Sequence, residues 1–107
     1  MHATYLTENY AVSPQISPEL VSLLKQEGFD AIVCNRPDNE DAGQPSFSAI
    51  AEAASTAGME AFHIPMMGPN FSQDDLAKLK EIIASKSKIF AFCRSGNRSS
   101  ILWKAAQ

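Results

Sequence analysis

The stretch IFAFCRSGNRSS, residues 89–100, ends an apolar run with a cysteine and continues into a polar, glycine-containing loop. If Cys93 lies between the end of a strand and the start of a helix, backbone N–H groups and the helix dipole stabilise its thiolate. Gly96 lets the backbone approach a bound anion closely. Arg98 can offer two parallel N–H bonds to a tetrahedral oxyanion, which a lysine cannot. The stretch therefore predicts a thiolate nucleophile that attacks a bound oxyanion.

The rest of this loop is expected to contribute to anion binding. The residues concerned are Arg94, Ser95, Gly96, Asn97 and Ser99. The hydroxyl of Ser99 or Ser100 could also donate to the thiolate. The alternative is a buried strand cysteine followed by a helix cap, because cysteine is commonly buried. Two arginines, a glycine and a serine in one tight loop favour the functional interpretation.

The segments around this loop alternate between helical and strand-like patterns. Short apolar runs at 29–34, 60–64 and 88–92 are typical of buried strands, and a shorter strand is expected around residues 10–12. Helices are predicted from Ser17, over 46–58, from Ser72 with a capping box to Asp75, and over the last nine residues. The alternation predicts one α/β domain, residues 1–107, in three layers with a central, mostly parallel sheet.

In such a sheet, ligands bind at the carboxyl ends of the strands. The segments 34–36, 65–68 and 93–98 all follow predicted strands and therefore meet at one edge. We expect Arg36, in the first of these segments, either to point toward the anion or to pair with the acidic loop that follows it. The sequence thus predicts a single site at this edge.

Four segments resemble one known family in order: SPQISPE, GFDAIVCNRPDNEDAGQPS, AGMEAFHIPM and FCRSGNRSSILW. The chain is similar to the phosphatase-like domain of the beta-lactamase hydrolase-like family, which is related in fold to dual-specificity protein tyrosine phosphatases. The resemblance implies that Cys93 is a nucleophile that becomes a cysteinyl-phosphate. It also implies that Arg98 binds the phosphate together with the backbone N–H groups of residues 94–98.

The spacing within the loop departs from the tyrosine-phosphatase signature. That signature has five residues between cysteine and arginine, whereas Cys93 and Arg98 are separated by four. The segment CRSGNRS instead resembles the active loop of rhodanese-type sulfurtransferases, in which the cysteine carries a persulfide. A sulfurtransferase is therefore a second hypothesis, and a catalytically weak anion-binding regulatory module is a third.

A phosphatase also needs an acid to protonate the leaving oxygen. Gly68 stands where the resemblance would place an aspartate. Asp38, Glu40 and Asp41 are the replacement candidates, and Asp38 is the first choice because Pro37 stiffens its backbone. The alternative is an ordinary solvated loop.

Cys34 ends one predicted strand as Cys93 ends another. If those strands are neighbours, Cys34 could trap an oxidised Cys93 as a disulfide. The alternative is that Cys34 is simply a buried strand thiol.

The composition narrows the possible partners. A net charge of -3 without clustered basic residues argues against nucleic acid, and no apolar stretch is long enough to span a bilayer. The N-terminus lacks the pattern of a signal peptide, so a cytoplasmic location is expected. The cysteines lack metal-ligand spacing, and neither a metal nor another cofactor is predicted. The expected partner is a phosphorylated or sulfur-donor substrate. A homo-oligomer is a further hypothesis, because the short C-terminus leaves little chain to cover one sheet face.

Overall fold

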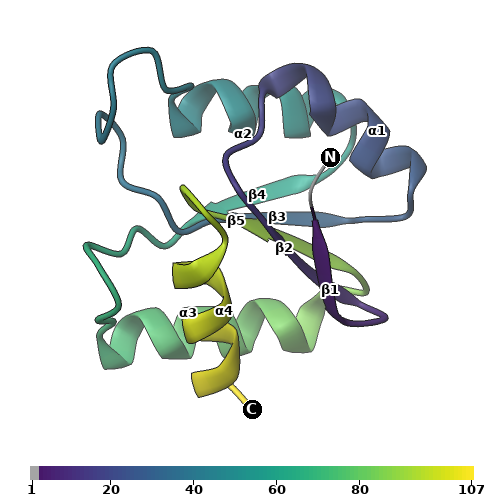
Figure 1. Cartoon of the computed structure of the whole chain (residues 1–107). Helices are drawn as coiled ribbons and strands as arrows, with labels where there is room; N and C mark the ends of the chain where they lie inside the picture. Colours follow the sequence, from purple (N-terminus) through teal and green to yellow (C-terminus); the bar gives the residue numbers. More distant parts are fainter. Residues whose placement is uncertain (1–2) are drawn as a thin grey trace.

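The computed structural model describes residues 3–107 as a five-stranded sheet between two pairs of helices (Figure 1). In chain order the elements are β1 (Thr4–Thr7), β2 (Tyr10–Ser13), the 3-10 turn η1 (Pro18–Leu20), α1 (Val21–Gln26), β3 (Ala31–Cys34), α2 (Phe47–Thr56), β4 (Glu60–His63), α3 (Gln73–Ser85), β5 (Ile89–Phe92) and α4 (Asn97–Ala105). The strand order is β1-β2-β5-β3-β4. All neighbours are parallel except β1 and β2. The predicted three-layer α/β architecture is confirmed.

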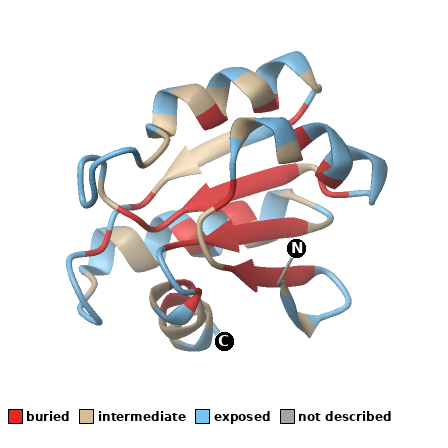
Figure 2. Cartoon of the chain, turned by 45° about the horizontal axis from the view of Figure 1, so that its top comes forward, coloured by how far each residue is buried: buried red, intermediate tan, exposed pale blue. Residues whose placement is uncertain are grey.

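Two apolar clusters fill the two faces of the sheet. Helices α1 and α2 pack on one face, around Leu24 and Ile50. Helices α3 and α4 pack on the other, around Leu79 and Leu102. Figure 2 shows the central strands as the most buried part of the molecule. Within residues 3–107 helices therefore lie on both faces of the sheet, and the oligomeric state stays a prediction.

Several element boundaries differ from the sequence-based expectation. Strand β1 was not predicted, because its short segment is polar and mostly exposed and owes its conformation to pairing with β2. The first helix begins as a 3-10 turn, and Ser17 precedes it without a side-chain capping bond. By contrast, the capping box of α3 is confirmed: the Ser72 hydroxyl accepts from the Asp75 N–H, and the Asp75 carboxylate accepts from the Ser72 N–H.

Backbone hydrogen bonds continue past the strand ends and hold the connecting loops together. The Asn35 N–H donates to the Phe92 carbonyl at 2.8 Å, and the Met66 N–H donates to the Asn35 carbonyl at 3.0 Å. The Cys93 N–H donates to the Ser13 carbonyl at 3.3 Å. The carboxyl ends of the parallel strands therefore form one continuous edge, as predicted. No helix within residues 3–107 has both the length and the apolarity needed to cross a bilayer.

Candidate active site

Cys93 follows β5 and lies buried at the N-terminus of α4. The Gly96 N–H donates to the Cys93 Sγ at 3.0 Å. Gly96 has a φ of 96°, and a Cβ at this position would lie 3.4 Å from the backbone of Ser13. The left-handed conformation favours glycine, whereas the contact to Ser13 is an ordinary van der Waals distance. The loop therefore turns its N–H groups inward around the sulfur, as the sequence predicted.

The two thiols have opposite electrostatic environments. Burial disfavours the Cys93 thiolate, but the N–H groups of Ser99, Ser95, Gly96 and Arg98 outweigh it and lower the pKa of Cys93 below its ordinary value. Burial raises the pKa of Cys34 to about 11, and the Cys34 Sγ donates to the Arg36 carbonyl at 3.3 Å. At neutral pH the thiolate is therefore concentrated on Cys93.

We expect a pH titration to separate these two thiols. Followed by the pH dependence of the rate of alkylation by iodoacetamide, Cys34→Ser protein should show one transition, with its midpoint lowered from the ordinary cysteine value. Cys93→Ser protein should show a single transition at a much higher pH, because Cys34 titrates at about 11. Two transitions at the same ordinary pH would contradict the N–H cradle around Cys93.

Arg98 lies in the first turn of α4, and its side chain is 12% exposed. Its Nη1 donates to the Glu40 Oε2 at 2.8 Å and to the Met66 carbonyl at 2.7 Å. Its Nη2 donates to the Glu40 Oε1 at 2.7 Å. These hydrogen bonds with Glu40, together with the nearby Cys93 thiolate, raise the pKa of Arg98. The guanidinium is thus fixed at three points beside the nucleophile.

Arg36 pairs with the acidic loop, the second of the two outcomes expected for it. Its Nε donates to Glu40 at 2.9 Å, and its Nη2 donates to Asp41 at 2.7 Å. Its Nη1 donates to Gln15 at 3.0 Å. The residue is 4% exposed, and each of its side-chain nitrogens has a partner. We therefore place Arg36 behind Glu40 and not as a direct ligand of the anion.

The carboxylates of this loop differ in their roles. Asp38 Oδ1 accepts from the Phe47 N–H at 2.8 Å and so caps the start of α2. Among residues 3–107, no hydrogen bond joins Asp38 to Cys93 or Arg98. Hydrogen bonds from Arg98, aided by Arg36, lower the pKa of Glu40 to about 2. Glu40 is therefore ionised at neutral pH and cannot donate the proton that a general acid supplies.

The other loop residues expected to bind the anion occupy distinct positions. The Arg94 side chain is 67% exposed and lies 3.6 Å from Asp41, so its guanidinium pairs with the acidic loop. The Ser95 hydroxyl accepts from the Asn97 N–H at 3.3 Å, within the turn. Ser99 is fully buried, and its hydroxyl has no partner among residues 3–107. The Ser99 hydroxyl therefore makes no hydrogen bond to the Cys93 sulfur in this structure, and donation from it to the thiolate stays a prediction.

Cys34 lies in the neighbouring strand, as the disulfide hypothesis requires. In the pairing of β3 with β5, Cys34 is opposite Phe92, the residue before Cys93. Both cysteines are free thiols in the structure. Disulfide formation between them stays a prediction.

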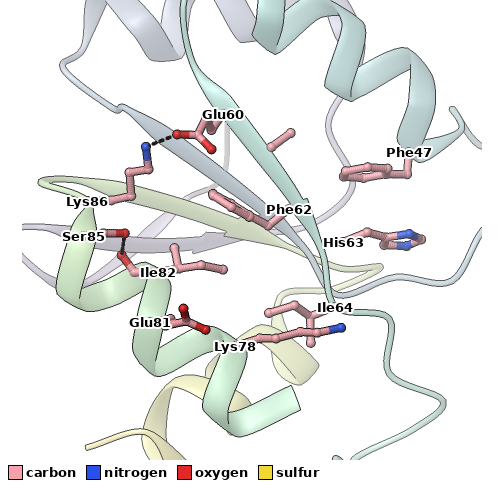
Figure 3. Close-up of a pocket in the computed structure, with 11 residues that line it drawn as sticks. Phe47, Glu60, Phe62, His63, Ile64, Lys78, Glu81, Ile82, Ser85 and Lys86 are labelled. Atoms are coloured by element: carbon pink, nitrogen blue, oxygen red, sulfur yellow. Dashed lines mark hydrogen bonds and ion pairs between the residues drawn. The ribbon is translucent and has the colours of Figure 1, made fainter. Parts of the chain in front are cut away.

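A groove of about 700 Å³ runs along the outer edge of β4 toward α3 (Figure 3). Figure 3 shows Phe47 and His63 at one end, where their rings stack, and the Glu60–Lys86 ion pair at the other. Its lining includes no residue of the 93–98 loop. The groove is therefore separate from Cys93. The candidate active site is accordingly located from Cys93 and Arg98 and not from this cavity.

Two hydrogen-bond contacts in the site were not predicted from the sequence. The Met66 carbonyl holds Arg98, and Gln15 holds Arg36. A backbone carbonyl has no sequence signal, and Gln15 lies outside the predicted strand ends. Within residues 3–107, no group of three His, Cys, Asp or Glu side chains is placed to hold a metal ion.

Comparison with known proteins yields related phosphatase-like structures. A solved structure of a candidate phosphatase from Neisseria meningitidis is 32% identical, with a TM-score of 0.84 over 96% of this chain and 74% of that one. A candidate phosphatase from Shewanella putrefaciens is 20% identical, with a TM-score of 0.82 over 98% of this chain and 66% of that one. The expected fold of the dual-specificity phosphatase type is confirmed.

The sequence comparison gives the same relationship. A beta-lactamase hydrolase-like protein from Agrobacterium fabrum is 31% identical over 104 residues, which are 96% of this chain but 24% of that protein. The chain thus spans about a quarter of the length of this relative. The family described as beta-lactamase hydrolase-like protein, phosphatase-like domain, matches residues 3–107. The chain therefore belongs to this family of phosphatase-like domains.

Proposed function

We propose that this domain is a cysteine-dependent phosphoric-monoester hydrolase. The observation that carries the proposal is the arrangement around Cys93: inward N–H groups lower its pKa, and the Arg98 guanidinium is fixed beside it. A thiolate and an arginine at a helix N-terminus suit a dianionic phosphoryl group. Membership of a phosphatase-like family supports the same chemistry.

The proposed reaction has two steps. The Cys93 thiolate attacks phosphorus, forming an S–P bond while the P–O bond to the leaving group breaks and its electron pair stays on that oxygen. Water then attacks phosphorus, the S–P bond breaks, and phosphate and the thiolate are released. Arg98 and the N–H groups stabilise the charge on the transferring oxygens in both steps. The backbone N–H groups of Ser99, Ser95 and Gly96 stabilise the departing thiolate in the second step.

The state of Glu40 points to a class of leaving group. Because the pKa of Glu40 is about 2, this carboxylate cannot protonate a departing alkoxide at neutral pH. An aryl oxide departs more readily without a proton, since its conjugate acid is much stronger than an alcohol. We therefore expect aryl phosphates to be better substrates than alkyl phosphates.

One observation favours sulfur transfer as the second candidate. Four residues separate Cys93 from Arg98, which is the loop length of rhodanese-type enzymes. In that reaction the thiolate would attack the outer sulfur of thiosulfate, the S–S bond would break and sulfite would leave. The resulting Cys93 persulfide would pass its sulfur to cyanide and regenerate the thiolate.

A paired assay distinguishes the two activities. Purified protein is given para-nitrophenyl phosphate in one reaction, and thiosulfate with cyanide in the other, at equal protein concentration. We expect release of nitrophenolate with an equal amount of phosphate, and no thiocyanate above the rate without protein. Phenyl phosphate and an alkyl phosphate, assayed in parallel, test the expected dependence on leaving group.

The other outcomes decide against the proposal. Thiocyanate without phosphate release would establish the sulfurtransferase. Neither product, with inorganic phosphate still bound, would leave the anion-binding regulatory module as the surviving hypothesis.

A further inference from the structure

The contacts of Arg98 divide its five N–H donors into two groups. A guanidinium has one N–H on Nε and two on each terminal nitrogen, all in fixed directions. Both Nη1 donors are used, by Glu40 and by the Met66 carbonyl, and one Nη2 donor is used by Glu40. The Nε donor and the second Nη2 donor have no carboxylate or carbonyl partner among the residues that the structure describes. These two donors are parallel and form one edge of the guanidinium.

This remaining edge suits an oxyanion. Two parallel N–H groups make the bidentate contact that arginine gives to carboxylates and phosphates. The Arg98 side chain also interacts with Cys93, so the guanidinium lies next to the sulfur. Glu40 thus binds the guanidinium at its end and leaves the parallel edge to Cys93 and to a ligand bound above the sulfur.

We propose that Glu40 is a positioning residue, which fixes the guanidinium of Arg98 so that its free edge meets the oxyanion above Cys93. This inference deepens the proposed function, on which its catalytic meaning rests. Glu40 itself touches neither the anion nor the sulfur in this arrangement. Its two carboxylate oxygens accept from Nη1 and Nη2, a contact that sets both the distance and the plane of the guanidinium.

Arg36 supports Glu40 from behind. Its Nε donates to the same Oε1 that accepts from Arg98, and its other nitrogens are held by Gln15 and Asp41. Arg36 has a side-chain exposure of 5%, against 27% for Glu40. A buried cation therefore fixes a carboxylate, which in turn fixes the arginine of the cysteine loop. Held from both sides, Glu40 restricts the motion of a long and otherwise flexible arginine side chain.

A different role for the same contact would be competition. If the Glu40 carboxylate occupied the place of the oxyanion, a ligand would have to displace it, and removing it would strengthen anion binding. The division of donors argues against this, because Glu40 uses the end of the guanidinium and not its free edge. The two roles predict opposite changes in anion affinity, so they can be separated by experiment.

The test compares Glu40→Gln and Glu40→Ala with Asp38→Asn, which removes a carboxylate of the same loop that contacts neither Arg36 nor Arg98 and leaves an amide oxygen to accept from the Phe47 N–H. Inorganic phosphate is titrated against each protein, with the amide chemical shifts of residues 93–98 as the readout. We expect the phosphate dissociation constant to rise about 10-fold in Glu40→Gln and about 10²-fold in Glu40→Ala, the range expected when charge-assisted hydrogen bonds to the ligand are weakened or lost. Asp38→Asn should stay within about fivefold of wild type.

A second readout excludes a general loss of structure. The thiolate titration of Cys93 should keep its lowered midpoint in both Glu40 variants, because backbone N–H groups set it. If that midpoint returns to the ordinary cysteine value, Glu40 merely maintains the loop and the positioning role is wrong. Unchanged or tighter phosphate binding in both Glu40 variants would overturn the proposal too.

These readouts do not depend on turnover. Protein that binds phosphate in a Glu40-dependent way but hydrolyses nothing would retain the positioning role and refute the proposed hydrolase. Conversely, protein that hydrolyses aryl phosphates equally well with and without Glu40 would support the proposed hydrolase and refute the positioning role.

Discussion

Replacing Cys93 with serine is expected to reduce aryl phosphate hydrolysis on the order of 10⁴-fold or more, as is usual for loss of a covalent nucleophile. The serine hydroxyl is not ionised at neutral pH, and this loop contains no base placed to activate it. The N–H groups of the loop stabilise an anion once it has formed, but they do not remove a proton. The measurement is the rate of nitrophenolate release by Cys93→Ser protein at saturating substrate.

Phosphate binding should survive the same substitution. Arg98 and the loop N–H groups remain in place, and the loss of the negatively charged sulfur removes a repulsion. Cys34→Ser is the matched control, since it removes the other thiol while a hydroxyl can still donate to the Arg36 carbonyl. We expect that variant to retain its activity. Comparable turnover by Cys93→Ser and wild-type protein would refute the covalent mechanism.

The sequence pattern predicts the edge of the sheet at which the site lies. Apolar strand runs, capping signals and glycines alternate regularly enough to predict parallel βαβ units. Parallel strands bring their carboxyl ends together. The strand pattern alone therefore predicts that Cys34, Met66 and Cys93 lie at one edge of the sheet. This part of the prediction depends on local patterns and on the geometry of parallel sheets, and it is confirmed by the strand order.

The contacts within the site could not be predicted in the same way. The loop that carries Glu40 has no regular structure, and Asn39 adopts a left-handed conformation with a φ of 63°. Which carboxylate reaches Arg98 therefore depends on several irregular backbone angles. The sequence favoured Asp38, which instead caps α2, while Glu40 forms the ion pairs with Arg36 and Arg98.

Replacing Arg98 with lysine is expected to lower kcat/KM for aryl phosphates about 10²- to 10³-fold, the usual cost of removing one donor to a developing oxyanion. Lysine keeps the positive charge, so the loss tests the geometry of the contact and not only its charge. An ammonium cannot present two parallel N–H bonds to a phosphate while its other donors bind Glu40 and the Met66 carbonyl. The phosphate dissociation constant should rise in the same variant.

Arg94→Lys provides the comparison, because it makes the same chemical change in the same loop. The Arg94 side chain is 67% exposed and pairs only loosely with Asp41, at 3.6 Å. An exposed pair of this kind contributes about 1 kcal/mol at most, so we expect no more than a fivefold effect. If both lysine variants lost activity equally, the loop would act through its total charge. A large loss confined to Arg98→Lys would instead show that catalysis depends on how Glu40 and Met66 orient one guanidinium beside Cys93.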